Sequence, residues 1–297
     1  DRVDHRPPIV RRPWLRSVSL RGSLVLTRQR HRVPIVRRTS RRLIADAFTK
    51  IGLATPALRV YEMLLSAART QKEIGDQPFP LPPPRLRVLV AGRPSADWFL
   101  ASGERAAEAV LDVAGPLAGQ RILEFGCGCG RVLRHLVATG ADVYGCDYNA
   151  KLLTWCQENL PGTYSINSPK PPLPYPDGFF DVVYTISVFT HLARDHQQPW
   201  LAELARITSR DGSVLITTQG NAYRSELRAD ELAVFESGDA VARREKASGL
   251  NLCSIYHPPT LVEQLARSAG LDCERSLEAR VFRLDLHVLR KYPSMEE

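Results

Sequence analysis

The sequence predicts an α/β protein built on a doubly wound, mostly parallel sheet, with a helical extension in front of it. Residues 121–147, RILEFGCGCGRVLRHLVATGADVYGCD, read as an apolar strand, a glycine-rich loop, a segment with helical spacing and a second strand that ends in an acid. Strand-like and helix-like segments then alternate through residue 289. Such alternation favours parallel strands joined by right-handed crossovers, with the ligand site at their carboxyl ends.

The chain before residue 95 divides into two predicted regions. Residues 1–42 contain 13 arginines, no lysine and two acids, so this arm carries about +11 and is expected to be disordered. Because the whole chain carries +8, the remainder is about −3, which argues against a basic nucleic-acid platform in the body. Residues 43–94 are predicted as an extension with short helices over 43–68, a stiff proline-rich linker over 78–84 and a short strand over 86–91.

The main domain is predicted to occupy residues 95–297. Residues 220–257 have mixed polarity and no clean period, so we expect them to form an insertion over the strand ends. Besides the unit at 121–147, the expected elements are helix 95–114, helix 151–159, strand 163–166, strand 181–187, helix 197–208, a turn at 211–212, strand 213–218, helix 258–269 and two closing strands, 271–277 and 279–289.

The loop after the first strand suits a nucleoside. Gly126, Gly128 and Gly130 allow the backbone to approach a ligand that any Cβ would push away. Asp147 follows 21 residues after Gly126, where an acid can accept hydrogen bonds from both ribose hydroxyls. The dinucleotide pattern GxGxxG requires glycine where Arg131 stands, so a nicotinamide dehydrogenase is disfavoured.

This motif, Glu124-Phe-Gly-Cys-Gly-Cys-Gly130, resembles the first motif of the class I S-adenosylmethionine-dependent methyltransferases. The resemblance extends through Lys291, and the segments GCGCGRVLRHL, SVFTHL, WLAEL and TTQG look like an uncharacterised bacterial group of these enzymes. It implies a seven-stranded Rossmann-like sheet with an antiparallel last strand, and S-adenosylmethionine as the cofactor.

The resemblance also implies roles for individual residues. The glycine loop and Glu124 would hold the methionine end of the cofactor, Asp147 the ribose, Tyr148 one adenine face, and Asn167 or Ser168 the adenine edge. The residues expected at the cofactor are Glu124, Phe125, Gly126, Cys127, Gly128, Gly130, Asp147, Tyr148, Asn167, Ser168, Ser187 and Val188.

The end of strand 181–187 narrows the predicted reaction. Related enzymes that methylate base or amide nitrogens usually have Asn/Asp-Pro-Pro-Tyr/Phe there, whereas this chain has Ser187-Val-Phe-Thr. Magnesium-dependent relatives need acids at this strand end, and none is present. We therefore expect metal-independent O-methylation of a small molecule or saccharide. The alternatives are N- or C-methylation of a small metabolite, and a nucleic-acid-associated methyltransferase or cofactor-binding protein that uses the arginine-rich arm.

Two histidines are candidates for a general base. His191 follows the end of strand 181–187 by four residues, and His257 lies between the insertion and helix 258–269. Both are also compatible with packing roles. The acceptor is expected to contact Trp98, Phe99, Arg105, Phe189, Gln219 and Tyr256.

The cysteines and the hydropathy indicate the setting. Cys127 and Cys129 lie inside the glycine loop, and no second Cys or His pair follows at zinc-like spacing, so no metal site is predicted. Free thiols fit a reducing, cytoplasmic environment. No apolar segment reaches 18 residues, so no membrane span is expected. The acceptor's identity and the oligomeric state stay open.

Overall fold

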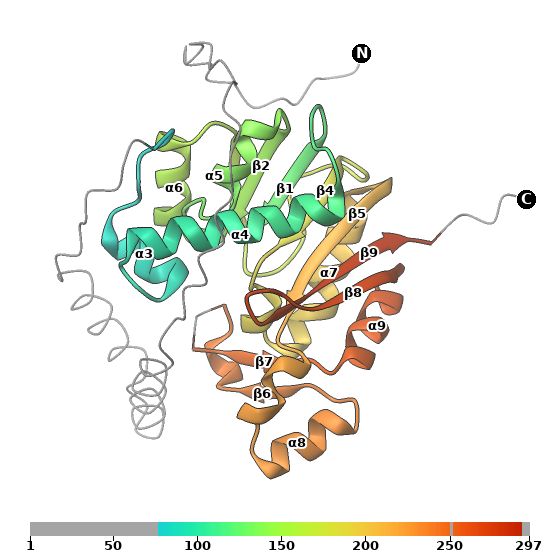
Figure 1. The fold of residues 1–297 in the computed structure, drawn as a ribbon. Coiled ribbons are helices and arrows are strands. Elements are labelled where there is room, and N and C mark those ends of the chain that lie inside the picture. Colours follow the sequence, from blue (N-terminus) through green and yellow to red (C-terminus); the bar gives the residue numbers. More distant parts are fainter. Residues whose placement is uncertain (1–76, 250–251, 293–297) are drawn as a thin grey trace, which may run out of the picture. The chain divides into compact units, whose positions relative to one another are not determined.

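The computed structural model describes residues 77–249 and 252–292. The arginine-rich arm and the helices expected over 43–68 lie outside the described residues. A seven-stranded sheet forms the centre, in the order β3-β2-β1-β4-β5-β9-β8 (Figure 1). Neighbouring strands are parallel from β3 to β5, and β9 runs antiparallel to both β5 and β8. The predicted fold class, including the antiparallel last strand, is confirmed.

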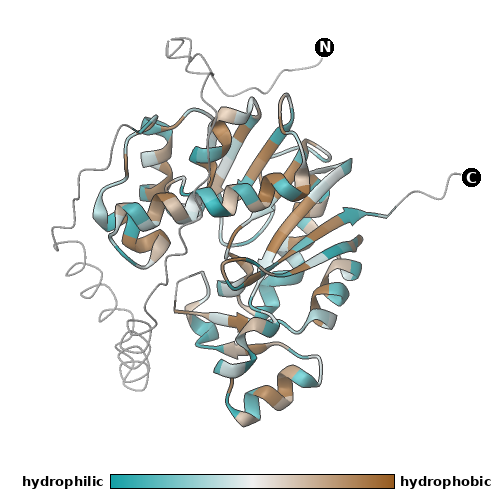
Figure 2. Ribbon diagram, in the orientation of Figure 1, coloured by the Kyte–Doolittle hydropathy of each residue, from teal (hydrophilic) through white to brown (hydrophobic). Residues whose placement is uncertain are grey.

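The central strands are buried on both faces. In β1, Ile122 joins one hydrophobic core and its neighbour Leu123 joins the other, because successive strand residues point to opposite sides. Figure 2 shows hydrophobic residues along these strands. The strands are β1 (Arg121–Phe125), β2 (Asp142–Asp147), β3 (Thr163–Ile166), β4 (Phe180–Thr185), β5 (Thr208–Thr218), β8 (Leu271–Val281) and β9 (Leu284–Lys291), with a separate pair, β6 (Val241–Arg243) and β7 (Ser254–Tyr256).

Helices cover both faces of the sheet. Side chains of α4, α5 and α6 enter the first core, and those of α7 and α9 enter the second. The helices are α3 (Pro84–Ala91), α4 (Ala96–Ala114), α5 (Leu133–Leu136), α6 (Ala150–Asn159), α7 (Arg194–Ile207), α8 (Ala229–Glu236) and α9 (Pro259–Ser268), and the 3₁₀ turns are η1 (Val137–Thr139), η2 (Phe189–His191), η3 (Asn221–Glu226) and η4 (Glu245–Ala247). Within the described residues, no helix is long and apolar enough to cross a membrane.

The strand predicted over 86–91 is wrong, because this segment is helix α3. Pro84 is at the start of the helix, where its fixed φ and missing N–H are tolerated. Leu86 and Val88 are buried, and Leu86 packs with Phe99 and Cys129. The short apolar run was therefore ambiguous, and packing against the glycine loop decides its conformation.

Several boundaries also differ from the prediction. The turn expected at 211–212 lies inside β5, whose pairing with β4 shifts register between Phe180 and Val182. The helix after the glycine loop has only four residues before it tightens into η1. Strand β4 ends at Thr185 and not at residue 187. The described residues of the expected insertion contain η3, α8, β6, η4 and β7.

Candidate active site

The glycine loop after β1 is fastened to the end of β2 by three consecutive amides. The N–H groups of Gly126 and Cys127 donate to the carbonyl oxygen of Cys146, at 2.8 and 3.0 Å. The N–H of Gly128 donates to Oδ2 of Asp147 at 2.9 Å. A turn therefore begins at Gly126, directly after β1, and its shape is set by Cys146 and Asp147, the last two residues of β2.

Glycine is required in this loop by conformation and by space. Gly126 and Gly128 have φ values of +77° and +55°, in the left-handed region that disfavours residues with a Cβ. A Cβ on Gly126 would lie 2.4 Å from Cγ2 of Val188, and one on Gly128 would lie 2.7 Å from Cγ2 of Val90. The loop is thus closely covered by the segment after β4 and by α3.

Glu124, in the strand β1 just before the loop, is buried with only 3% of its surface exposed. Its Oε2 accepts hydrogen bonds from the N–H of Leu133 at 3.1 Å and from the hydroxyl of Tyr184 at 3.2 Å. Burial raises the pKa of Glu124 to about 8, even though the nearby Arg131 guanidinium acts in the opposite direction. The protonated form of this carboxyl group is therefore favoured near neutral pH.

Asp147 and Asn167 present hydrogen-bond acceptors that suit the donor groups of a nucleoside. Burial raises the pKa of Asp147, whereas the N–H groups of Asn149 and Gly128 that bond its two oxygens act to lower it. A carboxylate has about four acceptor positions, so two remain for ribose hydroxyls. Oδ1 of Asn167, just after β3, is buried and has no hydrogen-bond partner. An acceptor left in this state fits an exocyclic amine such as that of adenine.

The backbone at the end of β4 is held in an unusual conformation. Ser187 has φ +68°, which is uncommon for a residue other than glycine. Its N–H donates to Oγ1 of Thr217 in β5 at 2.7 Å, and its carbonyl oxygen accepts from the hydroxyl of Thr190 at 2.8 Å. These contacts turn the chain sharply and bring Val188 onto Gly126.

His191 lies in η2, directly after this turn, and is partly exposed. Its Nδ1 lies 2.6 Å from the carbonyl oxygen of Cys253. Because a carbonyl can only accept, Nδ1 carries the hydrogen in the neutral ring and Nε2 has the lone pair. The tautomer is therefore suited to accepting a proton at Nε2.

Five of the residues predicted as catalytic or acceptor-contacting are buried: His257, Phe99, Phe189, Tyr256 and Gln219. Nε2 of His257 lies 3.0 Å from Oε1 of Gln197, and burial lowers the pKa of His257 to about 3. His257 is only 1% exposed, and this burial does not fit its predicted role as a general base. Phe99, Phe189 and Tyr256 are each 1% exposed or less and pack in the hydrophobic cores, and the Tyr256 hydroxyl also accepts from Arg243, so none of the three fits a direct acceptor contact.

Trp98 and Arg105 both contact Phe282, which lies at the tip of the β8–β9 hairpin. The ring of Trp98 stacks on Phe282 with centroids 6.1 Å apart, and the guanidinium of Arg105 lies 5.4 Å from the Phe282 centroid. Phe282 itself has φ +62°. Gln219, at the end of β5, is 8% exposed, and its carbonyl oxygen accepts from the N–H of His257. The sequence pattern gave no indication of Phe282.

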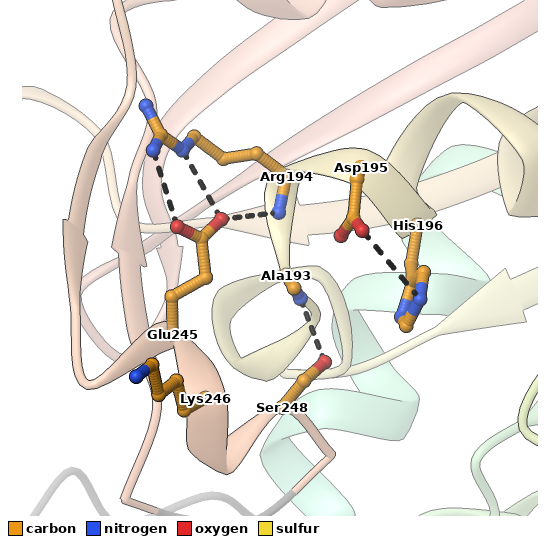
Figure 3. Close-up of a pocket in the computed structure, with 7 residues that line it drawn as sticks. All are labelled: Ala193, Arg194, Asp195, His196, Glu245, Lys246 and Ser248. Carbon is orange, nitrogen blue, oxygen red and sulfur yellow. Dashed lines mark hydrogen bonds and ion pairs between the residues drawn. The ribbon is translucent and has the colours of Figure 1, made fainter.

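The predicted cofactor residues do come together. They lie at or just after the carboxyl ends of β1, β2, β3 and β4, which are neighbours in the sheet. No motif predicted a contact between this edge and a particular residue of the insertion, yet the hydroxyl of Tyr148 donates to the carbonyl oxygen of Gly249 at 2.7 Å. Near this contact, a hollow of about 490 Å³ lies between the start of α7 and η4 (Figure 3), lined by Ala193, Arg194, Asp195, His196, Glu245, Lys246 and Ser248.

The glycine loop, Asp147 and Asn167 thus lie at the carboxyl ends of neighbouring parallel strands in a seven-stranded sheet. Residues 123–216 match the family model of the methyltransferase domain. The chain therefore contains a methyltransferase domain, with the mostly parallel seven-stranded sheet of solved S-adenosylmethionine-dependent methyltransferases.

Particular relatives differ in what they act on. The chain is 26% identical over 181 residues to tRNA N(3)-cytidine methyltransferase METTL2 of Gallus gallus, covering 57% of this chain and 47% of that protein. It is 27% identical over 169 residues to the ubiquinone biosynthesis O-methyltransferase of Thiobacillus denitrificans, covering 55% and 69%. The chain thus spans about half the length of the tRNA methyltransferases it matches.

Solved structures share the fold. An S-adenosylmethionine-dependent methyltransferase from Mesorhizobium loti superposes with a TM-score of 0.50 at 19% identity, covering 64% of this chain and 98% of that one. The CcbJ methyltransferase from Streptomyces caelestis also gives 0.50, at 18% identity, with coverage of 70% and 96%. At this level of identity the likeness is one of fold.

The buried Glu124 predicts a specific pH dependence. Its pKa in the folded state is above the unfolded value, so its contribution to stability is complete below about pH 4.5 and decreases as pH rises toward 8. Glu124→Gln keeps an oxygen for Leu133 and Tyr184 but cannot ionise. Between pH 5 and pH 8, we expect the wild type to lose about 1 kcal/mol or more of unfolding free energy relative to this variant.

Urea unfolding at both pH values measures this difference. Glu108→Gln, on the exposed face of α4, serves as the control and should track the wild type. If Glu124→Gln and the wild type change in parallel between the two pH values, Glu124 is already ionised in the folded protein at pH 5.

Proposed function

We propose that this protein catalyses the metal-independent transfer of a methyl group from S-adenosylmethionine to a hydroxyl oxygen of a small molecule or saccharide. The observation that supports the proposal is how the segment after β4 is held: Val188 packs on Gly126 of the glycine loop, and the carbonyl oxygen of His191 is linked through Gly249 to Tyr148, the residue after Asp147. Donor-binding groups and a candidate proton acceptor then share one edge of the sheet.

The donor would be held by groups on four neighbouring strand ends. Asp147 has acceptor positions for the ribose hydroxyls, and Oδ1 of Asn167 is available for the adenine amine. The glycine loop would approach the methionine end through its backbone. When bound, the donor supplies a methyl group activated by the positively charged sulfur. The methyl group bonds to the acceptor oxygen as the carbon–sulfur bond breaks, and the sulfur keeps the electron pair as the neutral thioether of the product.

The acceptor side would be organised by His191 and the hairpin tip. His191 would take the proton from the acceptor hydroxyl at Nε2, while its Nδ1–H stays bonded to Cys253. Alignment of the two reactants contributes on the order of 7–11 kcal/mol to such a displacement. A positioned base adds typically about 10²–10⁴-fold, so geometry is the larger effect. Trp98, Arg105 and Gln219 are the remaining candidates for acceptor contacts.

A second candidate is methylation of RNA. Some of the similar proteins are named tRNA N(3)-cytidine methyltransferases, and the first 42 residues of this chain contain 13 arginines. The rest of the chain is about −3, so RNA affinity would reside in the arm. A screen of the full chain that follows product S-adenosylhomocysteine, with hydroxylated metabolites, saccharides and tRNA transcripts as acceptors, separates the two candidates.

The donor assignment predicts the effect of changing Asp147. Asp147→Asn removes the charge that the ribose hydroxyls would face, and a hydrogen bond to a charged group contributes about 1.5–3 kcal/mol. We therefore expect isothermal titration to show S-adenosylhomocysteine binding weakened by roughly 10- to 100-fold, and no binding of NAD to the wild type. Asp142→Asn, at the opposite end of the same strand, should bind normally. Equal affinity in Asp147→Asn and the wild type would remove Asp147 from the donor site.

The base assignment predicts the effect of changing His191. In His191→Asn the side-chain amide can still donate to the carbonyl of Cys253, but no group accepts a proton. With the acceptor found in the screen, we expect turnover to fall by about 10²–10⁴-fold, with donor affinity within about threefold of wild type. His196→Asn, in α7, is the control and should retain turnover. Full turnover in His191→Asn across pH 6 to 9 would leave alignment alone to explain catalysis.

A further inference from the structure

Five residues of the insertion, Glu245–Gly249, run from the start of α7 toward the end of β2. Here they are called the strap. They comprise η4 and the two residues after it. The sequence predicted only an insertion in this region. The strap contacts the segment that follows β4, from His191 to Arg194, and Tyr148, which follows β2.

The strap is anchored at the amino terminus of α7. The N-cap residue Ala193 has no side chain that can bond the first amides of the helix. Instead, Oγ of Ser248 accepts from the N–H of Ala193 at 2.8 Å, and Oε1 of Glu245 accepts from the N–H of Arg194 at 2.8 Å. The same carboxylate forms a bidentate pair with the Arg194 guanidinium, at 3.1 Å for each contact (Figure 3). A carboxylate at this end of a helix is also favoured by the helix dipole.

The other end of the strap joins two strand ends. The N–H of Gly249 donates to the carbonyl oxygen of His191 at 2.8 Å, and its carbonyl oxygen accepts from the Tyr148 hydroxyl at 2.7 Å. His191 follows β4 and Tyr148 follows β2. Because β1 lies between β2 and β4 in the sheet, the link spans the carboxyl end of β1, where the glycine loop begins.

Tyr148 is the point at which the strap acts on the site. Its side chain is 46% exposed, so packing alone does little to fix the ring. The hydroxyl bond to Gly249, 101 residues along the chain, therefore sets the direction of a ring that stands directly after Asp147. Gly249 has φ +80°, which glycine adopts without strain.

We propose that the strap is part of the donor site: by holding Tyr148 and His191 across the end of β1, it forms a wall over the nucleoside and slows its release. This rests on the proposed function, because the nucleoside is the donor or its demethylated product. Tyr148 would contact the nucleoside directly, whereas Glu245 and Ser248 are positioning residues that act through Gly249.

The test compares release of S-adenosylhomocysteine from full-length variants by surface plasmon resonance. Tyr148→Phe keeps the ring and removes only the bond to Gly249. Loss of one neutral hydrogen bond should raise the dissociation rate constant by roughly 3- to 10-fold, with little change in association. Tyr144→Phe is the matched control, since its hydroxyl bonds Asp142 near the opposite end of β2, and its rate should equal that of the wild type.

The positioning role requires a second comparison. Glu245→Ala should raise the dissociation rate by a similar factor, while Glu274→Ala, which breaks an exposed ion pair with Arg290 on β8 and β9, should not. If Glu245 and Tyr148 act through the same strap, the double variant should release the ligand little faster than either single variant. A purely structural effect of Glu245 would lower the melting temperature and leave this coupling at zero.

The outcomes separate the two proposals. If the wild type binds no S-adenosylhomocysteine, the proposed function fails. If the wild type binds it and Tyr148→Phe releases it at the wild-type rate, or the two substitutions multiply independently, the strap is not part of the donor site and the proposed function is unaffected. A faster rate in Tyr144→Phe would also contradict the inference.

Discussion

The fastening of the glycine loop to β2 is the constraint on which the rest of the site depends. Three consecutive amides, those of Gly126, Cys127 and Gly128, donate to the last two residues of β2. A buried turn needs hydrogen-bond partners for its N–H groups, and these contacts supply them without regular secondary structure. The same contacts fix the backbone beside Asp147. They therefore hold the groups that would meet a ribose and a methionine in one relative position. Parallel pairing of β1 with β2 determines this geometry, because it brings the two strand ends level.

Local pattern was sufficient to predict the strand, the glycine loop and the acid that the structure brings together here. The strand, the alternating glycines and the acid at the end of β2 lie within 27 residues, and each has a direct conformational meaning. The seven strands and the antiparallel last strand were predicted from the family resemblance, and the mostly parallel sheet from the alternation of elements. By contrast, α3 was misassigned, because eight residues with several apolar positions fit a strand as well as a helix until Val90 is seen packing on Gly128.

The acceptor half was less predictable for a physical reason. Whether Phe99, Tyr256 or His257 faces a ligand or the core depends on contacts between segments far apart in sequence. His257 is enclosed by Gln197 of α7, 60 residues away, and Tyr148 meets Gly249 across 101 residues. The hydropathy pattern of residues 220–257 has no periodicity from which such pairings could be predicted. The turn at Ser187, where φ is positive, is held in part by Thr217 on the neighbouring strand, a contact that lies 30 residues away in the sequence.

His191 connects the two halves. Its Nδ1 is bonded to Cys253 and its carbonyl oxygen to Gly249, so the insertion holds it through both the ring and the backbone. The insertion would therefore set the tautomer of the candidate base and the position of the Tyr148 ring together. Residues that shape an acceptor pocket are generally free to vary when they lie on loops. Here the segments around Gly249 and Cys253 are constrained by the donor side, so changes of acceptor preference are expected to map to other parts of the insertion, such as α8, and to the hairpin tip at Phe282.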